Sequence, residues 1–340
     1  MDSKDLTKVQ KDREEKLKIL REKGFNYPNK FEKKDYLGEI SSKFSKSSKS
    51  SLEDKKVSIC TAGRIVLKRV MGNAAFMTLE DSSGRLQIFL SRNKLNEKLD
   101  EAKDLDLGDI IGVKGILFRT NTDELTVDLD SFELLTKSLK PMPEKHKGLT
   151  DIETIYRKRY LDLMSNPESR EVFIKRNKII KSLRTNLESN GFLEVETPMM
   201  HPIPGGANAR PFETHHNALD KKLYLRVAPE LYLKRLLVGG YEKVFEINRN
   251  FRNEGISTIH NPEFTMLEFY EAYGDLQRTA KFIQKLIQDS ILAVNDSLKI
   301  TYDQKNINFE KDFEIRSLKE LVKEELNVES LELSLIHISE

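Results

Sequence analysis

Two runs of the sequence decide the fold: Phe245-Glu-Ile-Asn-Arg-Asn-Phe-Arg252-Asn-Glu254 and Ile259-His260-Asn-Pro-Glu-Phe264-Thr-Met-Leu-Glu268. They predict a strand, a charged loop and a second strand. An arginine and a glutamate follow the first strand, and a histidine and a phenylalanine lead into the second. This order suits ATP, because Arg252 can bind a phosphate and Phe264 can stack on a flat base. The carboxylates of the second strand suit a cationic amino acid.

Composition limits the class of protein before any motif is considered. The chain has 340 residues, enough for roughly two domains, with 38% apolar and 33% charged residues. No apolar run approaches the ~20 residues of a membrane span, and the N-terminus lacks an apolar signal core, so we expect no membrane partner. A single cysteine, Cys60, excludes an intramolecular disulfide framework and a cysteine-cluster zinc site. We therefore expect a protein of the reducing cytoplasm.

The net charge of +2 conceals a basic N-terminal arm. Residues 1–56 contain 16 Lys or Arg against 11 Asp or Glu. Such an arm is compatible with contact to a phosphate backbone. On charge alone, however, a solvated helix is the more economical interpretation.

The N-terminal half predicts a helical arm followed by a β-barrel. Residues 4–24 have a helical pattern, and residues 43–51 have the composition of a loop. From 57 to 137 the pattern predicts five short strands, with a turn at 81–84 and a helical piece at 92–102 after the third strand. This order is typical of an OB-fold barrel. We expect an arm at 1–55, the barrel at 56–140 and a linker at 141–166.

The C-terminal half predicts a mixture of helices and strands. A helix is expected at 167–190, where Asn166 can cap it, Pro167 suits its first turn and Gly191 ends it. A strand starts at Phe192, and short strands then continue to Tyr270 around a helix at 229–238. Another helix is expected at 276–293, and residues 300–331 are weakly patterned. The fold class is therefore α+β.

The two opening runs resemble motif 2 of class II aminoacyl-tRNA synthetases, in detail that of the bacterial-type enzymes for lysine. The segment Gly191-Phe-Leu-Glu-Val-Glu-Thr-Pro198 resembles motif 1. The resemblance implies an OB-fold anticodon-binding domain, then a class II catalytic domain at 167–331 with an antiparallel sheet flanked by helices. It implies that lysine and ATP form lysyl-adenylate and pyrophosphate, and that the lysyl group is transferred to the 3′ end of lysine tRNA. Magnesium would bridge the phosphates.

The resemblance assigns the ATP-binding residues. Arg252 would hold both the amino-acid carboxylate and the α-phosphate, where a guanidinium can form paired hydrogen bonds and stabilise developing charge. Phe264 would stack on adenine, His260 would meet the outer phosphates, and Glu254 and Asn261 would read adenine. Taken singly, each has a common structural alternative: an ion pair for the arginine, a core position for the phenylalanine.

The resemblance also assigns the residues that would select the amino acid, and the main ones are carboxylates. An unpaired ammonium is costly in a cleft. The resemblance places Glu268 and Tyr270, which are two apart and so face the same way along a strand, on the ε-ammonium of lysine. Glu230 would hold the α-ammonium, and Gly206 would allow the backbone to approach the substrate. A lone glutamate is more often an exposed surface charge.

Two further sites follow from the resemblance. Arg69, Phe76 and Gln87 fall at the anticodon contacts of the barrel, where Phe76 can stack on an unpaired base and Gln87 can donate to or accept from a base edge. A barrel phenylalanine is more often core. The helix and strand of motif 1 would form a homodimer interface, with Pro198 near the partner's active site. An ordinary packed helix is the alternative.

The sequence also departs from the family pattern. It ends before the glycine-rich motif 3, where a second phosphate-binding arginine and the acidic magnesium ligands are expected, so no metal ligand is assigned. Residues 332–340 are expected to be a non-native tail, and the fragment alone is expected to be inactive. Rival interpretations are an aspartate or asparagine enzyme, the paralogue that lysylates a translation factor, and an RNA-binding protein without catalysis. The carboxylates at 230 and 268 disfavour the first pair, and the barrel disfavours the paralogue.

Overall fold

The computed structural model describes residues 8–142 and 151–326. The chain divides into two compact units, Met1–Pro167 and Glu168–Glu340. The expected motif 1 and motif 2 segments lie in the second unit, and the expected tail at 332–340 lies outside the described residues.

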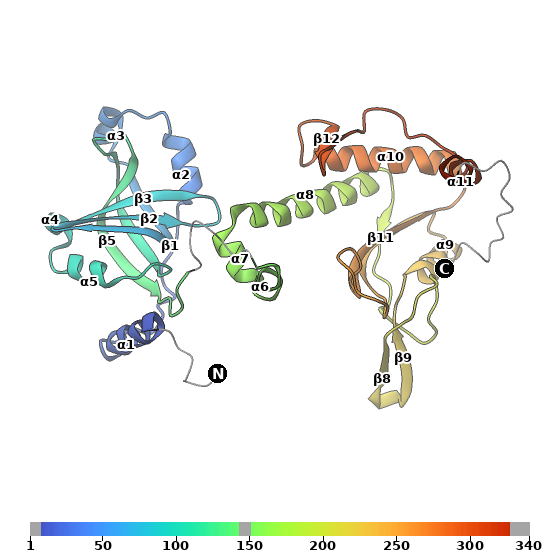
Figure 1. Cartoon of the computed structure of the whole chain (residues 1–340), viewed down its shortest axis with the longest axis horizontal. Helices are drawn as coiled ribbons and strands as arrows, with labels where there is room; N and C mark the ends of the chain where they lie inside the picture. The colour runs from blue at the N-terminus through green and yellow to red at the C-terminus, as the bar shows by residue number, and fades with distance from the viewer. Residues whose placement is uncertain (1–7, 143–150, 327–340) are drawn as a thin grey trace. The chain divides into compact units, whose positions relative to one another are not determined.

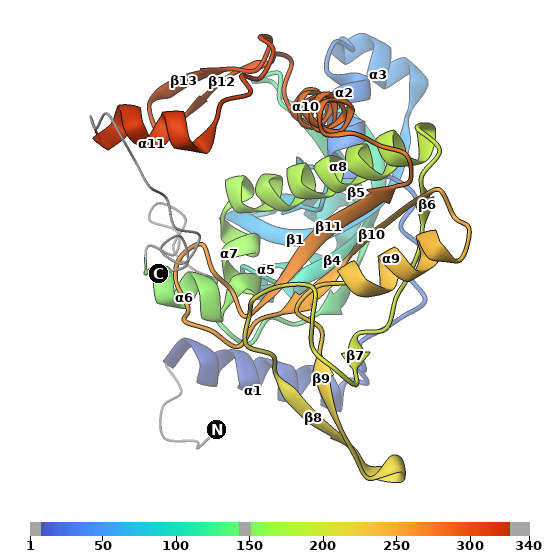
Figure 2. The ribbon, with the colours of Figure 1, turned by 90° about the vertical axis from the view of Figure 1, so that its right-hand side faces the viewer.

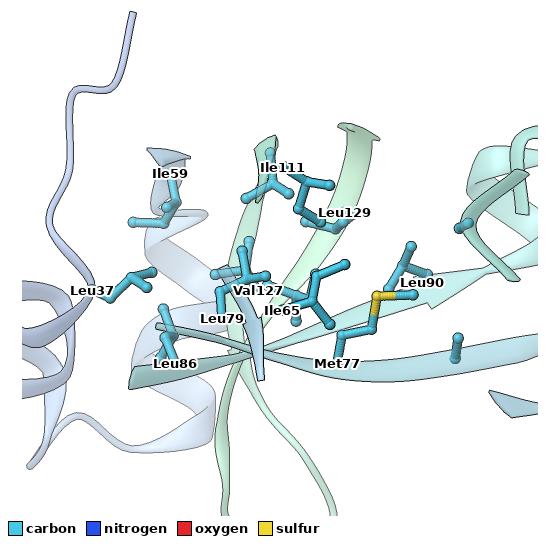
Figure 3. Close-up of a cluster of buried hydrophobic side chains, with 14 of the residues drawn as sticks. Leu37, Ile59, Ile65, Met77, Leu79, Leu86, Leu90, Ile111, Val127 and Leu129 are labelled. Carbon is cyan, nitrogen blue, oxygen red and sulfur yellow. The ribbon is translucent and has the colours of Figure 1, made fainter. Parts of the chain in front are cut away.

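Five strands of the first unit form a closed barrel in the order β1-β2-β3-β5-β4 (Figure 1). They are β1 (Ser58–Met71), β2 (Ala74–Glu80), β3 (Arg85–Ser91), β4 (Ile110–Arg119) and β5 (Leu125–Thr136). Alternate side chains fill the interior; Ile65, Met77, Leu79 and Val127 are almost fully buried there (Figure 3). The OB-fold prediction is confirmed, because alternating apolar residues in five strands can be buried without leaving open sheet edges.

The segment before the barrel contains more helix than expected. After α1 (Lys8–Glu22) come α2 (Leu37–Phe44) and α3 (Lys49–Lys55), so the prediction of a loop at 43–51 is wrong at both its ends. The Ser48 hydroxyl accepts a hydrogen bond from the backbone N–H of Ser51 and caps α3. Leu37 and Leu52 are fully buried in the barrel core. Serine-rich composition therefore indicated helix caps rather than an extended loop.

Two short helices follow the third strand where a single piece was expected. They are α4 (Arg92–Leu95) and α5 (Lys98–Asp104). Asn96 follows the last turn of α4 with a positive φ of 49°, and its backbone N–H donates to the Arg92 carbonyl. The expected linker also contains two short helices, α6 (Ile152–Arg157) and α7 (Arg159–Ser165).

In the second unit a long helix leads into a small sheet. The helix α8 (Pro167–Ser189) ends in a Schellman motif: Gly191 has φ 82°, its N–H bonds the Glu188 carbonyl, and the Phe192 N–H bonds that of Leu187. The sheet has the order β11-β10-β6. Its strands are β6 (Leu193–Glu194), β10 (Lys243–Phe251) and β11 (Glu263–Glu271). The long pair is antiparallel, whereas β6 pairs with β10 in parallel.

One face of this sheet is apolar and packs against α8 and α10 (Leu276–Leu292), which lie across it (Figure 2). Phe245 of β10 is fully buried among Leu187 of α8, Phe192 and Leu286 of α10. The rings of Phe192 and Phe282 stack with centroids 5.5 Å apart. This layer fixes the sheet and leaves its other face for polar side chains.

The remaining elements surround the sheet. A second sheet, β7-β9-β8, contains β7 (Met200–His201), β8 (Glu213–His216) and β9 (Lys221–Leu225), with a 3₁₀ turn η1 (Asn217–Leu219). Helix α9 (Glu230–Val238) follows, and the chain continues through the hairpin of β12 (Lys299–Tyr302) and β13 (Lys305–Asn308) to α11 (Leu318–Leu326). None of the described helices has the length and apolarity needed to cross a bilayer.

Candidate functional site

The polar face of the β10–β11 pair collects most of the residues singled out in the second unit. Register places Glu246 opposite Glu268, and Asn250 opposite Phe264. Side chains two apart share a face of a strand, so these four lie on one surface. Phe245, Ile247, Leu267 and Phe269 of the same strands face the apolar core on the other side. A single alternating pattern therefore supplies both the core and the candidate site.

Arg252 lies directly after β10, and its backbone N–H donates to the Pro262 carbonyl at 2.8 Å. Its guanidinium carbon is 5.2 Å from the ring centroid of Phe264. The Nε atom is buried and has no hydrogen-bond partner within the described residues. A buried donor without a partner is unfavourable unless a ligand or water completes it. The two residues expected to hold the α-phosphate and the adenine are thus neighbours.

The loop between the strands holds three further predicted residues, and all three are exposed. Glu254 accepts a hydrogen bond from the backbone N–H of Arg210 at 3.2 Å. It lines a cavity of about 640 Å³ with Asn208 and Arg210. His260 is held by a contact of 2.8 Å between its Nδ1 and the Ser257 hydroxyl. Asn261 lies beside His260 at the end of the loop. All three can reach a ligand from solvent.

The predicted lysine-binding carboxylates form an electrostatically coupled group. The Tyr270 hydroxyl donates to Glu268 at 3.1 Å. Burial raises the pKa of Glu268, the Tyr270 hydrogen bond opposes this, and the negative charge of Glu230 adds to the rise. Burial and the Glu268 carboxylate also raise the pKa of Tyr270. Such a group favours a cation, because a positive ligand relieves the repulsion between the carboxylates.

Gly206 lies against the start of α9, which carries Glu230. Its φ is +93°, and a Cβ atom there would be 3.1 Å from the Cβ of Glu230 and 3.2 Å from that of Ala228. Glycine is therefore required by conformation and by space. Glu230 also pairs with Lys234 at 2.6 Å, one helical turn away. This exposed pair leaves Glu230 able to exchange one ammonium for another.

Sequence reasoning missed a buried ion pair beneath the site. Arg226 and Glu246 are 0% and 1% exposed and their charged groups lie 2.7 Å apart. The Thr197 hydroxyl donates to the second Glu246 oxygen at 2.6 Å. Through Thr197, this network holds the segment that carries Pro198, whose carbonyl lies 2.8 Å from the His201 ring. The available signal was an arginine in an otherwise apolar strand end, Leu225-Arg226-Val227.

Two buried polar atoms next to this network lack hydrogen-bond partners within the described residues: Arg226 Nη2 and Asn250 Oδ1. Together with Arg252 Nε they lie on or beside the polar face of the sheet. In folded proteins such atoms are rare and are usually satisfied by water or ligand. Three of the five such atoms found among the described residues lie here, which makes this face a candidate binding surface.

In the first unit, a cavity of about 450 Å³ on the barrel brings Arg69, Phe76 and Gln87 together. The ring of Phe76 lies 4.7 Å from that of Phe89 on the neighbouring strand. Phe76 is half-buried, so one side of its ring packs and another remains accessible. An aromatic platform beside a guanidinium and an amide is suited to an unpaired base. A larger cavity of about 810 Å³ between α1 and the barrel was not foreseen.

The described residues contain no group of three or more His, Cys, Asp or Glu side chains arranged to hold a metal ion. The described residues therefore do not fit a magnesium site.

Two family models match the chain. The model of "tRNA synthetases class II (D, K and N)" matches residues 151–336, and the model of an "OB-fold nucleic acid binding domain" matches residues 59–135. The first covers more than half of the chain, and the second covers the barrel strands.

Curated relatives are similar along almost the whole chain. A lysine–tRNA ligase of Legionella pneumophila (strain Lens) is 54% identical over 313 residues, which are 91% of this chain and 62% of the relative. That of Chromobacterium violaceum is 51% identical over 322 residues, 94% of this chain and 64% of the relative. That of Neisseria gonorrhoeae (strain ATCC 700825 / FA 1090) is 50% identical over 312 residues, which are 92% of this chain and 62% of the relative. The chain thus spans less than two thirds of the length of these relatives.

Proposed function

From the premise that the chain belongs to the class II tRNA synthetases for aspartate, lysine and asparagine, we propose that the protein of which it is part is an ATP-dependent lysine–tRNA ligase. A lysine carboxylate oxygen attacks the α-phosphorus of ATP, the bond to the β-phosphate oxygen breaks, and pyrophosphate leaves. The terminal ribose hydroxyl of lysine tRNA then attacks the adenylate, and AMP leaves.

Arg252 is the proposed catalytic residue of the first step. Its unpartnered Nε and its position against the Phe264 ring support a role for the guanidinium between the lysine carboxylate and the α-phosphate. There it stabilises the charge that develops on phosphorus oxygens. Phe264 stacks on adenine, Glu254 and Asn261 contact its edge, and His260 meets the outer phosphates.

Lysine is proposed as the amino-acid substrate because Glu230, Glu268 and Tyr270 form an electrostatically coupled group. The raised pKa of Glu268 reflects burial and the nearby Glu230 carboxylate. An ammonium relieves both costs, whereas the carboxylate of aspartate would add a third negative charge. Asparagine would bring no charge. Gly206 gives the substrate room beside Glu230.

The barrel at 56–140 is the proposed anticodon-binding domain, with Arg69, Phe76 and Gln87 on the unpaired bases. The catalytic domain is proposed for 167–331, with 1–55 as an N-terminal arm and 141–166 as the linker. Magnesium is proposed to act with ligands outside the described residues.

The protein is proposed to act in the cytoplasm as a homodimer through α8 and the segment around Pro198. Val172 and Ile174 support this, since they place large apolar side chains on the surface of α8 with exposed fractions of 63% and 47%. A second copy of the helix would cover them.

Equilibrium binding of lysine to this chain tests the proposal. Lysine should bind at neutral pH, and aspartate and asparagine should not. Glu268→Gln should abolish most of the lysine affinity, while Glu213→Gln, which removes an exposed carboxylate of β8, should leave it unchanged. Equal binding of the three amino acids, or equal losses in both variants, would refute the assignment of lysine.

A further inference from the structure

The two carboxylates of the proposed lysine site belong to different elements. Glu268 lies on β11, whereas Glu230 opens helix α9, which packs on the β10–β11 pair (Figure 2). A ligand with two ammonium groups must match the distance between the carboxylates, because a fixed separation fits one chain length best. The contacts that fix the start of α9 on the sheet therefore determine which diamino acid fits.

The segment that leads into α9 has little freedom of its own. Val227, Ala228 and Pro229 separate Arg226 from Glu230, and all three are buried. The ring of Pro229 also restricts its backbone φ. The position of Glu230 is thus set mainly by how Arg226 is held.

The backbone of Arg226 is bonded to a neighbouring segment on each side. Its N–H donates to the Met199 carbonyl at 2.8 Å, and its carbonyl accepts from the Phe251 N–H at 3.0 Å. One bond to each neighbour fixes the place of the residue but allows the segment to turn about the line between them. Contacts away from that line are needed to fix the direction in which α9 starts.

The Arg226 side chain supplies these contacts. Its Nε donates to the Arg249 carbonyl at 2.9 Å, and its Nη1 donates to Glu246 at 2.7 Å and to the Thr197 hydroxyl at 3.0 Å. A guanidinium presents its donors in a rigid plane, so one side chain can hold several groups in a fixed geometry. The segment before α9 is thereby tied to β10 and to the residues that precede Pro198.

The same contacts relate Glu230 to Glu268. Strand register places Glu246 directly opposite Glu268. Arg226 is therefore bonded to the neighbour of one carboxylate and, through three buried residues, carries the other. Stability alone does not account for this pair, because a buried ion pair is often no more stabilising than apolar residues of similar volume.

We propose that Arg226 is a positioning residue that sets the separation of Glu230 and Glu268, and thereby the length of the diamino acid that the site accepts. Arg226 is fully buried, so it acts through these carboxylates and not by touching the ligand. Lysine is accepted, and ornithine, which is one methylene shorter, is rejected. This inference rests on the proposed lysine specificity and names the residue that controls chain length.

The test compares the affinities of the whole 340-residue chain for lysine and for ornithine by titration calorimetry. The unchanged chain should prefer lysine by roughly tenfold or more, the usual effect of one methylene in a specific pocket. Arg226→Met with Glu246→Leu removes both charges of the buried pair, which keeps the second unit folded, and leaves no side-chain hydrogen bond at position 226. Its preference for lysine should fall to about threefold or less.

Two controls separate positioning from loss of stability and from loss of charge. Leu286→Ala opens a cavity in the core on the opposite face of the sheet, so it should destabilise the second unit yet retain the lysine preference. Arg226→Lys keeps a positive charge beside Glu246 but cannot bond Glu246, Thr197 and the Arg249 carbonyl together. It should lose the preference as the double variant does. Backbone hydrogen exchange of each variant checks that the second unit is folded.

The outcomes are distinguishable. If the unchanged chain binds no lysine, the proposed function and this inference both fail. If it binds lysine but does not prefer it to ornithine, or if either Arg226 variant retains the preference, lysine binding stands and the positioning role is refuted. Loss of the preference in Leu286→Ala, or a folded double variant that binds neither amino acid, refutes it as well. Loss confined to the two Arg226 variants, with binding retained, supports it.

Discussion

Replacing Glu246 by glutamine should destabilise the second unit far more than any exposed carboxylate would. The change preserves the shape of the side chain but removes the charge that faces Arg226 across 2.7 Å, with both side chains at most 1% exposed. The arginine would then remain buried without a counter-ion. The hydrogen bonds from Thr197 and Asn248 to the carboxylate, at 2.6 and 3.1 Å, would also weaken.

Removing one partner of a buried ion pair costs about 3–5 kcal/mol. Since each 1.4 kcal/mol is a factor of ten, local opening of β10 should become roughly 10²- to 10⁴-fold more frequent. Backbone hydrogen exchange of residues 243–251, measured by mass spectrometry at neutral pH, reports this opening directly. Exchange within the barrel strands serves as the internal reference.

Two comparison variants sharpen the measurement. Glu213→Gln breaks an ion pair of the same length, 2.7 Å, whose Lys222 and Glu213 side chains are 54% and 58% exposed, and should cost at most about 1 kcal/mol. The double variant Arg226→Met with Glu246→Leu removes both charges and should regain most of the lost stability. If Glu246→Gln changes exchange by less than threefold, or the double variant is worse than the single one, the electrostatic reasoning is wrong.

Three further outcomes are expected. Lysine affinity of the unchanged chain should rise with pH through the raised pKa of Glu268 and then level off, since only the ionised form pairs with the ammonium; titration calorimetry of Glu268→Gln should show weaker binding without this pH dependence. Burial would raise the pKa of Asp81, but hydrogen bonds from the Leu37 N–H, Lys33 and Ser83 lower it from 3.8 to about 2. Asp81→Asn should therefore destabilise the barrel by about 2 kcal/mol at neutral pH, and acid titrations should show the difference vanishing as pH falls from about 4 to 2. Gly115→Ala should lower the thermal unfolding temperature of the barrel, because its Cβ would lie 2.2 Å from the Asp128 carbonyl oxygen, and an unchanged melting curve would contradict this.

The architecture could be predicted wherever a residue pattern has one physical solution. Five alternating runs with a helical insertion can bury their apolar residues in a closed barrel, and the structure has that barrel. The family assigned from Arg252, Phe264 and Glu268 is confirmed by the family model that matches residues 151–336. The individual roles given to these residues remain predictions. Geometry brings Arg252 to Phe264 and Tyr270 to Glu268, as their spacing along the strands requires.

What sequence reasoning missed depends on contacts between distant segments. The serine-rich composition near residue 48 predicts a loop, whereas the capping role of Ser48 depends on where Leu52 is buried. Arg226 and Glu246 are 20 residues apart, and the local sequence around either one does not predict that both are buried. The contact of Thr126 with Gln87 spans 39 residues and requires the barrel to close first. Pairings of this kind are fixed by tertiary structure and leave no local pattern.

The strict alternation along β10 and β11 has a consequence for how this protein can change over evolutionary time. Because neighbouring positions serve opposite faces, substitutions at positions such as 248 and 268 can alter the polar face while Phe245, Ile247, Leu267 and Phe269 preserve the packing on the other. Insertions are tolerated very differently along the same stretch. Extra residues between 254 and 260 would lengthen an exposed loop without changing which face of either strand a side chain occupies. One extra residue inside either strand would exchange its two faces beyond the insertion. Charged side chains would then point into the apolar core and core phenylalanines would point to the polar face, so we expect the lengths of both strands to be preserved.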